Sequence, residues 1–262
     1  MAKLSALHGY AEEFEKKLRL KTFPIAVKLL EKEEDIPEGA IRPKRDLGQH
    51  IALCVALTRS RREGITIAML KEDMWCFDPV IGLGLAEPPE YFLEGYNRFP
   101  ESAMTLEAGR TWAGAFPRLE YGKYIGIVSA PLKIVNFEPD LVIIYCDSAQ
   151  LTQLLMAANC TDGRDVTGRL SGLSACVYAI TPVMQSKEYQ VTSPCAGDSR
   201  HAMSQDDEML FTAPIEKVED LITGLRYLEE HNYTLPRTLT VEHEYVLPEK
   251  YEKIGKMLGM DI

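Results

Sequence analysis

The chain has 262 residues, 46% hydrophobic and 26% charged, which is ordinary for a globular protein whose core forms without disulfides or metal ions. Its 39 acidic residues outnumber its 29 basic ones, and the net charge of -10 argues against a nucleic-acid-binding protein. No run of about 20 apolar residues could span a bilayer, and the N-terminal segment lacks the apolar core of a signal peptide. We therefore expect a cytoplasmic protein whose cysteines stay reduced.

The first part of the chain alternates helical and strand patterns. The expected elements are a helix over 4–20, a strand over 25–30, a charged loop over 31–46, a helix over 46–62 that ends at Gly64, and a strand over 65–70. A small apolar run at 80–85 follows, and Pro88 and Pro89 then break the chain before another short helix.

The second part continues this alternation. The expected elements are strands over 124–128 and 141–146, a helix over 150–159 capped by Asp147 or Ser148, a polar loop over 163–172, a helical or mixed segment over 173–184, strands over 189–192 and 208–211, a helix over 215–231 and a final helix over about 248–258. The pattern predicts an α/β or α+β fold in which helices flank a mixed sheet.

Three short segments recur in the same order along the chain. The pairs are 24–27 with 139–143, 53–57 with 175–179, and 129–135 with 212–218. The repeat predicts one compact unit of two pseudo-symmetric halves. Its expected parts are an N-terminal helix over 1–22, a first half over 23–136, a second half over 137–232 and a C-terminal helical extension over 233–262.

Four of the six cysteines occupy matching positions in the two halves. Cys54 and Cys176 fall on apolar helical segments, and Cys76 and Cys195 fall just beyond strands. Open α/β units gather ligands beyond strand ends, so a two-fold relation would bring all four together in a site between the halves. The alternative is that they are small core residues, an interpretation that suits Cys54 and Cys176 better than the other two.

The remaining cysteines and the charged runs have simpler interpretations. Cys146 and Cys160 have no counterpart in the other half, so we expect structural roles for them. The basic run 59–62 precedes Gly64, where it would complement a helix dipole rather than bind phosphate. The acidic run 206–208 is typical of a charged loop rather than a cation site, because successive strand residues point to opposite faces.

The residues around the cysteines indicate what chemistry is possible. Thiolates select zinc or iron–sulfur clusters, although the chain has no C-x-x-C pair. Beyond Cys195, Gly197 would allow close backbone approach to a ligand, Arg200 could grip a carboxylate or phosphate, and His201 could donate, accept or ligate. The alternative is a polar turn. A Cys–His hydrolase built on Cys195 and His201 lacks any family signature.

These segments carry a resemblance to a known family. They are 54–70, 71–73 with Cys76, 82–85, 173–176, 193–200 and 206–211. The chain resembles the domain of unknown function 169 family from about residue 23 to about residue 231, a family found in archaea and anaerobic bacteria. The resemblance brings no established activity. It implies a cytoplasmic protein of anaerobic metabolism, compatible with oxygen-sensitive cysteine chemistry.

The leading hypothesis is a metal- or iron–sulfur-binding protein that could act as a redox enzyme. Its metal ligands would be Cys54, Cys76, Cys176 and Cys195, and its substrate contacts would be Gly197, Arg200 and His201. The expected cofactor is an iron–sulfur cluster, with zinc or no cofactor as the alternatives. A metal-free protein that binds a small anionic ligand is the second hypothesis, and a cofactor-delivery or maturation partner is the third. We expect a small-molecule ligand or a redox partner protein, and neither nucleic acid nor a membrane.

Overall fold

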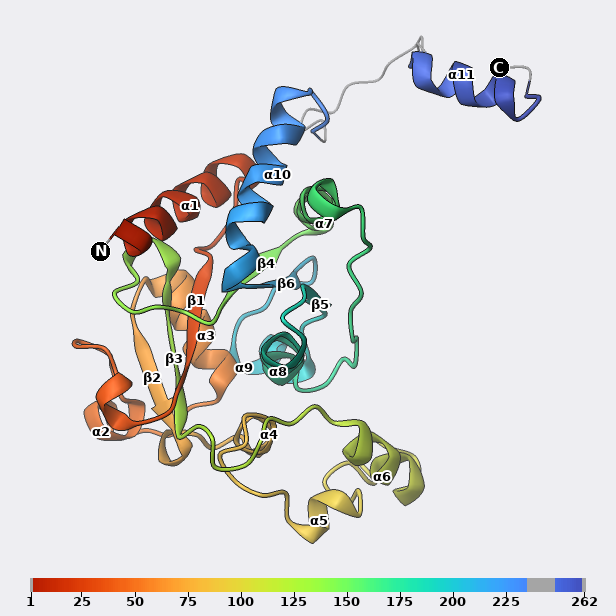
Figure 1. Cartoon of the computed structure of the whole chain (residues 1–262). Helices are drawn as coiled ribbons and strands as arrows, with labels where there is room; N and C mark the ends of the chain where they lie inside the picture. The colour runs from red at the N-terminus through yellow and green to blue at the C-terminus, as the bar shows by residue number, and fades with distance from the viewer. Residues whose placement is uncertain (1, 235–247, 261–262) are drawn as a thin grey trace.

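The computed structural model describes residues 2–234 and 248–260, and it confirms an α/β fold built on one six-stranded sheet (Figure 1). The strands are β1 Ile25–Leu30, β2 Ile67–Leu70, β3 Gly126–Pro131, β4 Leu141–Cys146, β5 Gln190–Thr192 and β6 Met209–Pro214. The helices are α1 Ala2–Leu18, α2 Pro43–Leu47, α3 Leu53–Glu63, α4 Phe77–Gly82, α5 Glu90–Leu93, α6 Leu106–Ala115, α7 Ser148–Asp162, α8 Ala175–Ser186, α9 Ala196–His201, α10 Val218–Glu230 and α11 Glu249–Met257.

The sheet is antiparallel in all its strand pairings, so the expectation of a mixed sheet is wrong. The alternation of strands and helices favoured parallel neighbours. However, the crossover from β1 through α3 to β2 skips one position, and β3 fills the gap antiparallel to both. The crossover from β4 to β5 skips a position in the same way, and β6 fills it. Parallel pairing among the described residues is confined to isolated bridges at Ile41 and Ile51.

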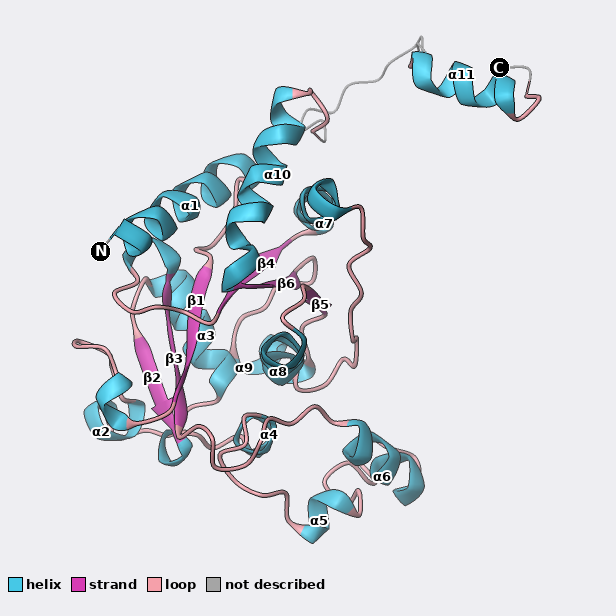
Figure 2. Cartoon of the chain, in the orientation of Figure 1, coloured by secondary structure: helices cyan, strands magenta, loops and turns pink. Residues whose placement is uncertain are grey.

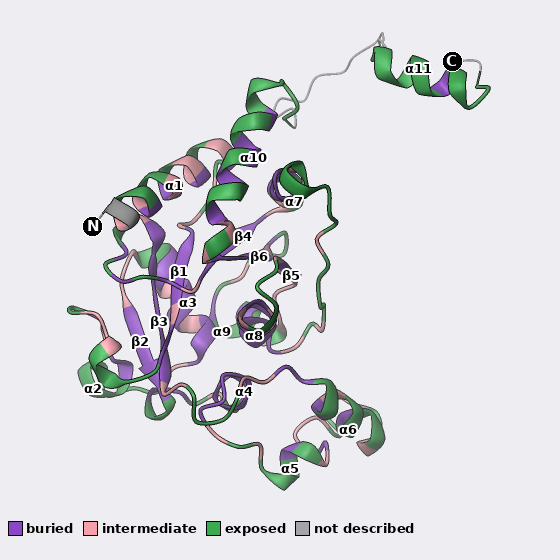
Figure 3. Ribbon diagram, in the orientation of Figure 1, coloured by how far each residue is buried: buried purple, intermediate pink, exposed green. Residues whose placement is uncertain are grey.

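Strand side chains alternate between two apolar cores, one on each face of the sheet. In β1, Ile25, Val27 and Leu29 enter one core, whereas Ala26 and Leu30 enter the other. Helices α1, α7 and α10 cover one face, and α3 and α8 cover the opposite face (Figure 2). The strands are therefore buried while the outer faces of the helices are exposed (Figure 3).

The strand order has the arrangement that a two-fold relation between halves requires. The sheet runs β2-β3-β1-β4-β6-β5. Counted outward from the centre of the sheet, each half places its first strand, then its third, then its second: β1, β3, β2 on one side and β4, β6, β5 on the other. The halves meet where β1 pairs with β4. Three-dimensional equivalence of the halves, and their division at residue 136, stay predictions. Part of the expected extension over 233–262 lies outside the described residues.

Local sequence signals account for several element ends. Asp147 caps α7, because its side chain accepts a hydrogen bond from the Gln150 backbone N–H, which confirms one of the two expected caps. The helix expected over 46–62 is instead two helices, because Gly48 adopts a left-handed φ of 66° that ends α2 before α3 begins. Over the described part of the chain, none of the helices has both the length and the apolar character needed to cross a bilayer.

Candidate functional site

The four cysteines of the repeat line a single cavity of about 170 Å³. We call it the thiol cavity. Its lining residues come from both halves of the chain: Ala52, Cys54, Trp75, Cys76, Asp78, Arg98, Leu173, Ser174, Cys176, Cys195, Ala196, Gly197 and His201. The structure thus brings together the four cysteines that the sequence analysis selected. Of the other two cysteines, Cys146 is buried in β4 and Cys160 is exposed on α7, and neither lines the cavity.

Each of the four cysteines lies at the beginning of a helix. Cys54 is the second residue of α3 and Cys176 is the second residue of α8. Cys76 and Cys195 directly precede α4 and α9. The first turn of a helix has backbone N–H groups without intrahelical partners, and it favours negative charge. The beginnings of the longer helices, α3 and α8, therefore suit thiolates.

Packing on the sheet holds these helices side by side. Helix α3 packs on β2 and β3, and α8 packs on β4, β5 and β6. The two helices also contact each other, and each contacts the short helix that follows the other half's second cysteine, α3 with α9 and α8 with α4. Both halves are thus needed to form the cavity.

Cys54 and Cys176 are buried, Cys76 and Cys195 are partly buried, and the thiols raise one another's pKa. Burial raises the pKa of Cys76 to about 11, and the charge of Asp78 adds to the effect. Burial also raises the pKa of Cys54 and of Cys176 well above the usual thiol range, and in both cases ionisation of the other cavity cysteines raises it further. Without a cation among them, the thiols are therefore protonated at neutral pH.

Backbone groups nearby act in the other direction. The backbone N–H of Asp78 lowers the pKa of Cys76, and the backbone N–H of Ala175 lowers the pKa of Cys195. Ala175 is the first residue of α8, so the beginning of that helix faces the sulfur that α9 carries. The environment combines desolvation, which opposes thiolates, with donors that favour them.

Asp198 is a buried carboxylate that sequence analysis did not select. Its Oδ2 accepts hydrogen bonds from the Cys195 thiol and backbone N–H, both at 3.2 Å, and its Oδ1 accepts from the Tyr145 hydroxyl at 3.4 Å. The side chain is 0% exposed, and burial raises its pKa above the usual carboxyl range. Its spacing of three residues after Cys195 at a helix start is the capping-box signal that could have identified it.

A buried ion pair between Arg61 and Glu208 lies against the Tyr145 ring, near the second half of the cavity. Arg61 Nη1 and Nη2 donate to the two Glu208 carboxylate oxygens at 2.6 and 3.0 Å, and its guanidinium lies 3.8 Å from the centre of the Tyr145 ring. Arg61 is 0% exposed and lies in the last turn of α3, where the basic run was expected, and it also forms this ion pair with Glu208. Glu208 was expected in a charged loop, but its side chain is buried, because a buried guanidinium needs a charged partner.

The opposite wall of the cavity contains a second charged group. Arg98 Nη2 donates to Asp78 Oδ2 at 2.8 Å and to Ser174 Oγ at 3.1 Å, and its guanidinium stacks 3.8 Å from the centre of the Trp112 ring. Ser174 has a left-handed φ of 53°, a strained conformation for a serine. Arg98 lies in an irregular stretch, and no sequence signal pointed to it.

The three predicted substrate contacts separate in the structure. Gly197 and His201 line the thiol cavity, and the His201 ring stands edge-on to Trp75 at 5.4 Å between ring centres. Arg200 is exposed and is not among the residues that line the cavity. The guanidinium beside the thiols belongs to Arg98 instead.

The four cysteines surround a space rather than converge on a point. Over the described residues, no group of three or more His, Cys, Asp or Glu side chains is gathered closely enough to hold a single metal ion. A structural zinc site requires four ligand atoms at roughly 2.0–2.3 Å from one ion. Thiols are donors suited to a sulfur-bound metal group, and four of them line this cavity.

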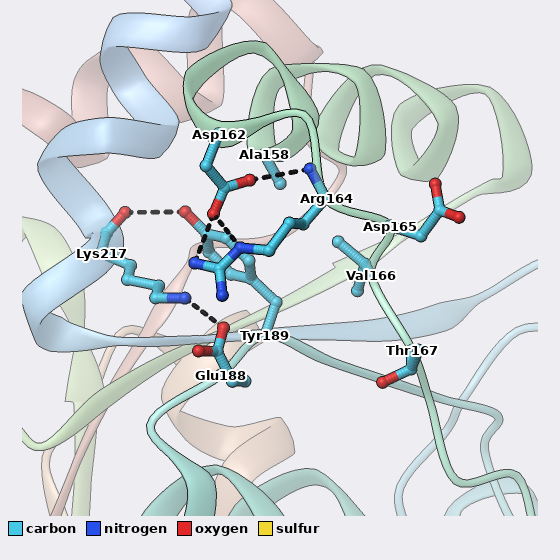
Figure 4. A pocket seen from close by; sticks show the side chains of 9 residues that line it. All are labelled: Ala158, Asp162, Arg164, Asp165, Val166, Thr167, Glu188, Tyr189 and Lys217. Carbon is cyan, nitrogen blue, oxygen red and sulfur yellow. Dashed lines mark hydrogen bonds and ion pairs between the residues drawn. The ribbon is translucent and has the colours of Figure 1, made fainter.

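Another cavity, of about 220 Å³, lies beside α7 and is less suited to a ligand (Figure 4). Its charged side chains pair with one another: Asp162 with Arg164 at 2.7 Å, and Lys217 with Glu188. The Tyr189 hydroxyl donates to the Lys217 carbonyl at 3.1 Å. These internal pairs neutralise most of its charge.

Fold and cavity together define an α/β protein in which two half-chains deliver four thiols to one cavity. The family of uncharacterised ArCR proteins, domain of unknown function 169, matches residues 13–224, and the chain belongs to this family. The resemblance seen in the sequence is confirmed. An uncharacterised protein of Methanocaldococcus jannaschii, MJ0308, is 24% identical over 213 residues, which cover 79% of this chain and 88% of the relative. No solved structure matches the chain.

Proposed function

We propose that the thiol cavity binds an iron–sulfur cluster through Cys54, Cys76, Cys176 and Cys195, and that the protein takes part in redox chemistry. The observation that carries the proposal is that four cysteines, two from each half of the chain, line one cavity. Four thiolates are the usual ligands of [2Fe–2S] and [4Fe–4S] clusters.

The electrostatics of the cavity support this choice. Burial and mutual repulsion hold the thiols protonated, and a bound metal group reverses that balance because its positive charge stabilises thiolates. The backbone N–H groups of Asp78 and Ala175 favour the thiolate forms of Cys76 and Cys195, because they lower the pKa of these thiols. Hydrogen bonds to sulfur are among the features that set cluster potentials.

The size of the cavity favours a cluster over zinc. The four cysteines surround about 170 Å³, whereas a single zinc ion would draw all four sulfurs to roughly 2.3 Å from one point. Zinc is therefore an outcome of the test rather than the proposal. When bound, the cluster would supply one-electron chemistry.

The neighbouring residues have separate roles in this proposal. Asp198 would hold a proton at the edge of the cavity, because its carboxylate already shares a hydrogen bond with Cys195 Sγ. The Arg98–Asp78 pair would fix the opposite wall. His201, which lines the cavity beside Trp75, would contact a small-molecule ligand or a redox partner protein. A cytoplasmic setting in anaerobic metabolism would protect such a cluster from oxygen.

The metal-free alternative has weaker support. A small anionic ligand needs a free cation, but Arg98 is already paired with Asp78 and Arg200 is outside the cavity. A cofactor-delivery role would use the same four thiols, and it would differ by transferring the cluster to a second protein.

The test is metal analysis of the anaerobically purified chain and of four single Cys→Ser variants at the cavity positions. Iron and acid-labile sulfide in the wild type, with both reduced in every cavity variant, is the expected result. Cys146→Ser is the control, because Cys146 is buried like Cys54 and Cys176 but lies outside the cavity, and it should keep both. Zinc alone, or no metal in a folded wild type, would contradict the proposal.

A further inference from the structure

A third cavity, of about 520 Å³, lies next to the thiol cavity and is lined mainly by apolar side chains. We call it the aromatic cavity. Its walls include Phe77, Tyr91, Phe92 and Tyr96, with Val80 and Ile81 of α4. Its volume falls within the range of small-molecule sites, roughly 300–1,000 Å³.

The two cavities share a stretch of wall. Cys76 lines the thiol cavity and the next residue, Phe77, lines the aromatic cavity. In the same way Asn97 lines the aromatic cavity and the next residue, Arg98, lines the thiol cavity. A ligand in the aromatic cavity would therefore lie beside the thiols.

The aromatic side chains form a rigid floor with exposed edges. Phe92 is 1% exposed and packs against Trp112 and Phe116, with ring centres 5.7 and 5.5 Å apart. Tyr91 and Tyr96 stack on each other at 5.2 Å, yet they are 63% and 43% exposed. Grouped, exposed aromatic rings over a packed floor are typical of a site that binds a flat apolar molecule.

Asn97 is an uncharged polar residue in the lining of this mainly apolar cavity. Its side-chain oxygen and nitrogen are both buried, and neither has a hydrogen-bond partner among the described residues. Both atoms are closed off from the open cavity, so a ligand that offers a donor and an acceptor would satisfy this unfavourable amide once the side chain turns toward it. Either orientation of the amide presents one of each, so the argument does not depend on which atom is the oxygen.

The charges around the aromatic cavity select against anions. Glu87 and Glu101 line it, and none of its described lining residues is basic. A ligand that carries phosphate or carboxylate at the ring would meet only negative charge there.

We propose that the aromatic cavity binds a planar nitrogen-heteroaromatic ring, uncharged or cationic, whose edge carries a hydrogen-bond donor beside an acceptor. The ring stacks on the tyrosines and phenylalanines, and its edge pairs with the Asn97 amide. This site does not require the cluster, since none of the four cavity cysteines lines it.

Lumichrome is a suitable probe, because it is flat, uncharged and carries adjacent N–H and C=O groups. Fluorescence titration of the full-length chain should show saturable binding of lumichrome. Its dimethylated analogue, in which methyl groups replace both N–H donors, should bind at least about tenfold more weakly, the effect of losing roughly 1.4 kcal/mol. Equal binding of the two compounds, or no saturable binding of lumichrome, would overturn the proposal.

Variants test the named residues. Asn97→Leu keeps the side-chain size and should weaken lumichrome at least about tenfold while leaving the dimethylated analogue unchanged. Tyr91→Ala should weaken both compounds, and Tyr121→Ala is the control, because Tyr121 is exposed and lies outside the cavity. Thermal unfolding of each variant establishes that it is folded. Unchanged lumichrome binding in folded Asn97→Leu and Tyr91→Ala would contradict the site.

Discussion

The two halves of the chain deliver their thiols in the same way but surround them differently. In both, a cysteine begins a helix that crosses the sheet, and a second cysteine follows the next strand. Residues 77–125 then separate Cys76 from β3 and contain α4, α5 and α6, whereas residues 196–208 separate Cys195 from β6 and contain only α9 in the described structure. The extra segment of the first half carries Arg98 and the aromatic cavity.

Some features of the cavity are common to both halves of the chain, and others occur in only one half. The shared frame provides four thiols, which is all that a cluster requires. The short second-half segment adds Asp198 against the Cys195 sulfur, and the long first-half segment adds a charged wall and the aromatic cavity. The thiol cavity thus has a buried carboxyl group on one side and an arginine with a neighbouring apolar cavity on the other.

The largest expected loss of stability comes from breaking the buried Arg61–Glu208 ion pair, which joins the two halves of the chain. Arg61→Ala leaves Glu208 buried without its partner, which should destabilise the chain by about 3–5 kcal/mol in urea unfolding. Arg59→Ala is the matched control, because Arg59 pairs with Glu63 at the surface and should cost about 0.5 kcal/mol. Similar losses in the two variants would show that the halves do not depend on this pair.

Asp198 provides the next test. Asp198→Ala removes the acceptor of three hydrogen bonds, from the Cys195 thiol, the Cys195 N–H and the Tyr145 hydroxyl. We expect a loss of about 1–3 kcal/mol by urea unfolding, and a smaller loss for Asp198→Asn, which keeps one acceptor. If Asn and Ala lose the same amount, the hydrogen bonds to this side chain are not what stabilises the second half of the cavity.

Acid should weaken the join between the halves. Burial raises the pKa of Glu208, but the hydrogen bonds from Arg61 and from the Gln205 backbone, with the charge of Arg61, outweigh it and leave the pKa below the usual glutamate range. Stability from this pair is therefore present above the unfolded pKa of about 4.3 and is lost as pH falls through the lower folded value. Glu208→Gln should show a shallower loss of stability below about pH 4.3 than the wild type, and identical acid profiles would refute this assignment.

The smallest effect is expected at the first-half wall. Arg98→Lys keeps the positive charge beside Asp78 but loses the planar stacking on Trp112, so we expect a loss of about 1 kcal/mol in urea unfolding. Lys133→Ala is a half-buried comparison in which a cation also lies over an aromatic ring, that of Phe23. A loss at Arg98→Lys no greater than at Lys133→Ala would mean that the Trp112 stack contributes no more than a surface contact.

The predictable part of this molecule is what short-range patterns encode. The apolar run at 141–146 and the Asp147 cap predicted β4 and the start of α7, and the repeated cysteine spacing selected four of the residues that line the thiol cavity. The antiparallel sheet was not predictable in this way, because the strand that fills each skipped position comes later in the chain.

Partners far apart in sequence account for the remaining misses. Arg61 and Glu208 are 147 residues apart in sequence and Arg98 and Ser174 are 76 apart, and a basic run or a single arginine does not reveal such a distant partner. Arg200 differs from these residues. Its position near Cys195 suggested a ligand contact, and the structure places it exposed and outside the lining of the thiol cavity.

The central claim is that the four thiols bind one cluster, and X-ray absorption at the iron edge of the anaerobically purified chain tests it most directly. The account predicts iron coordinated by sulfur alone, with iron–iron scattering from neighbouring atoms of the same cluster. Iron bound by nitrogen or oxygen without iron–iron scattering, or a folded chain that contains no iron, would contradict it.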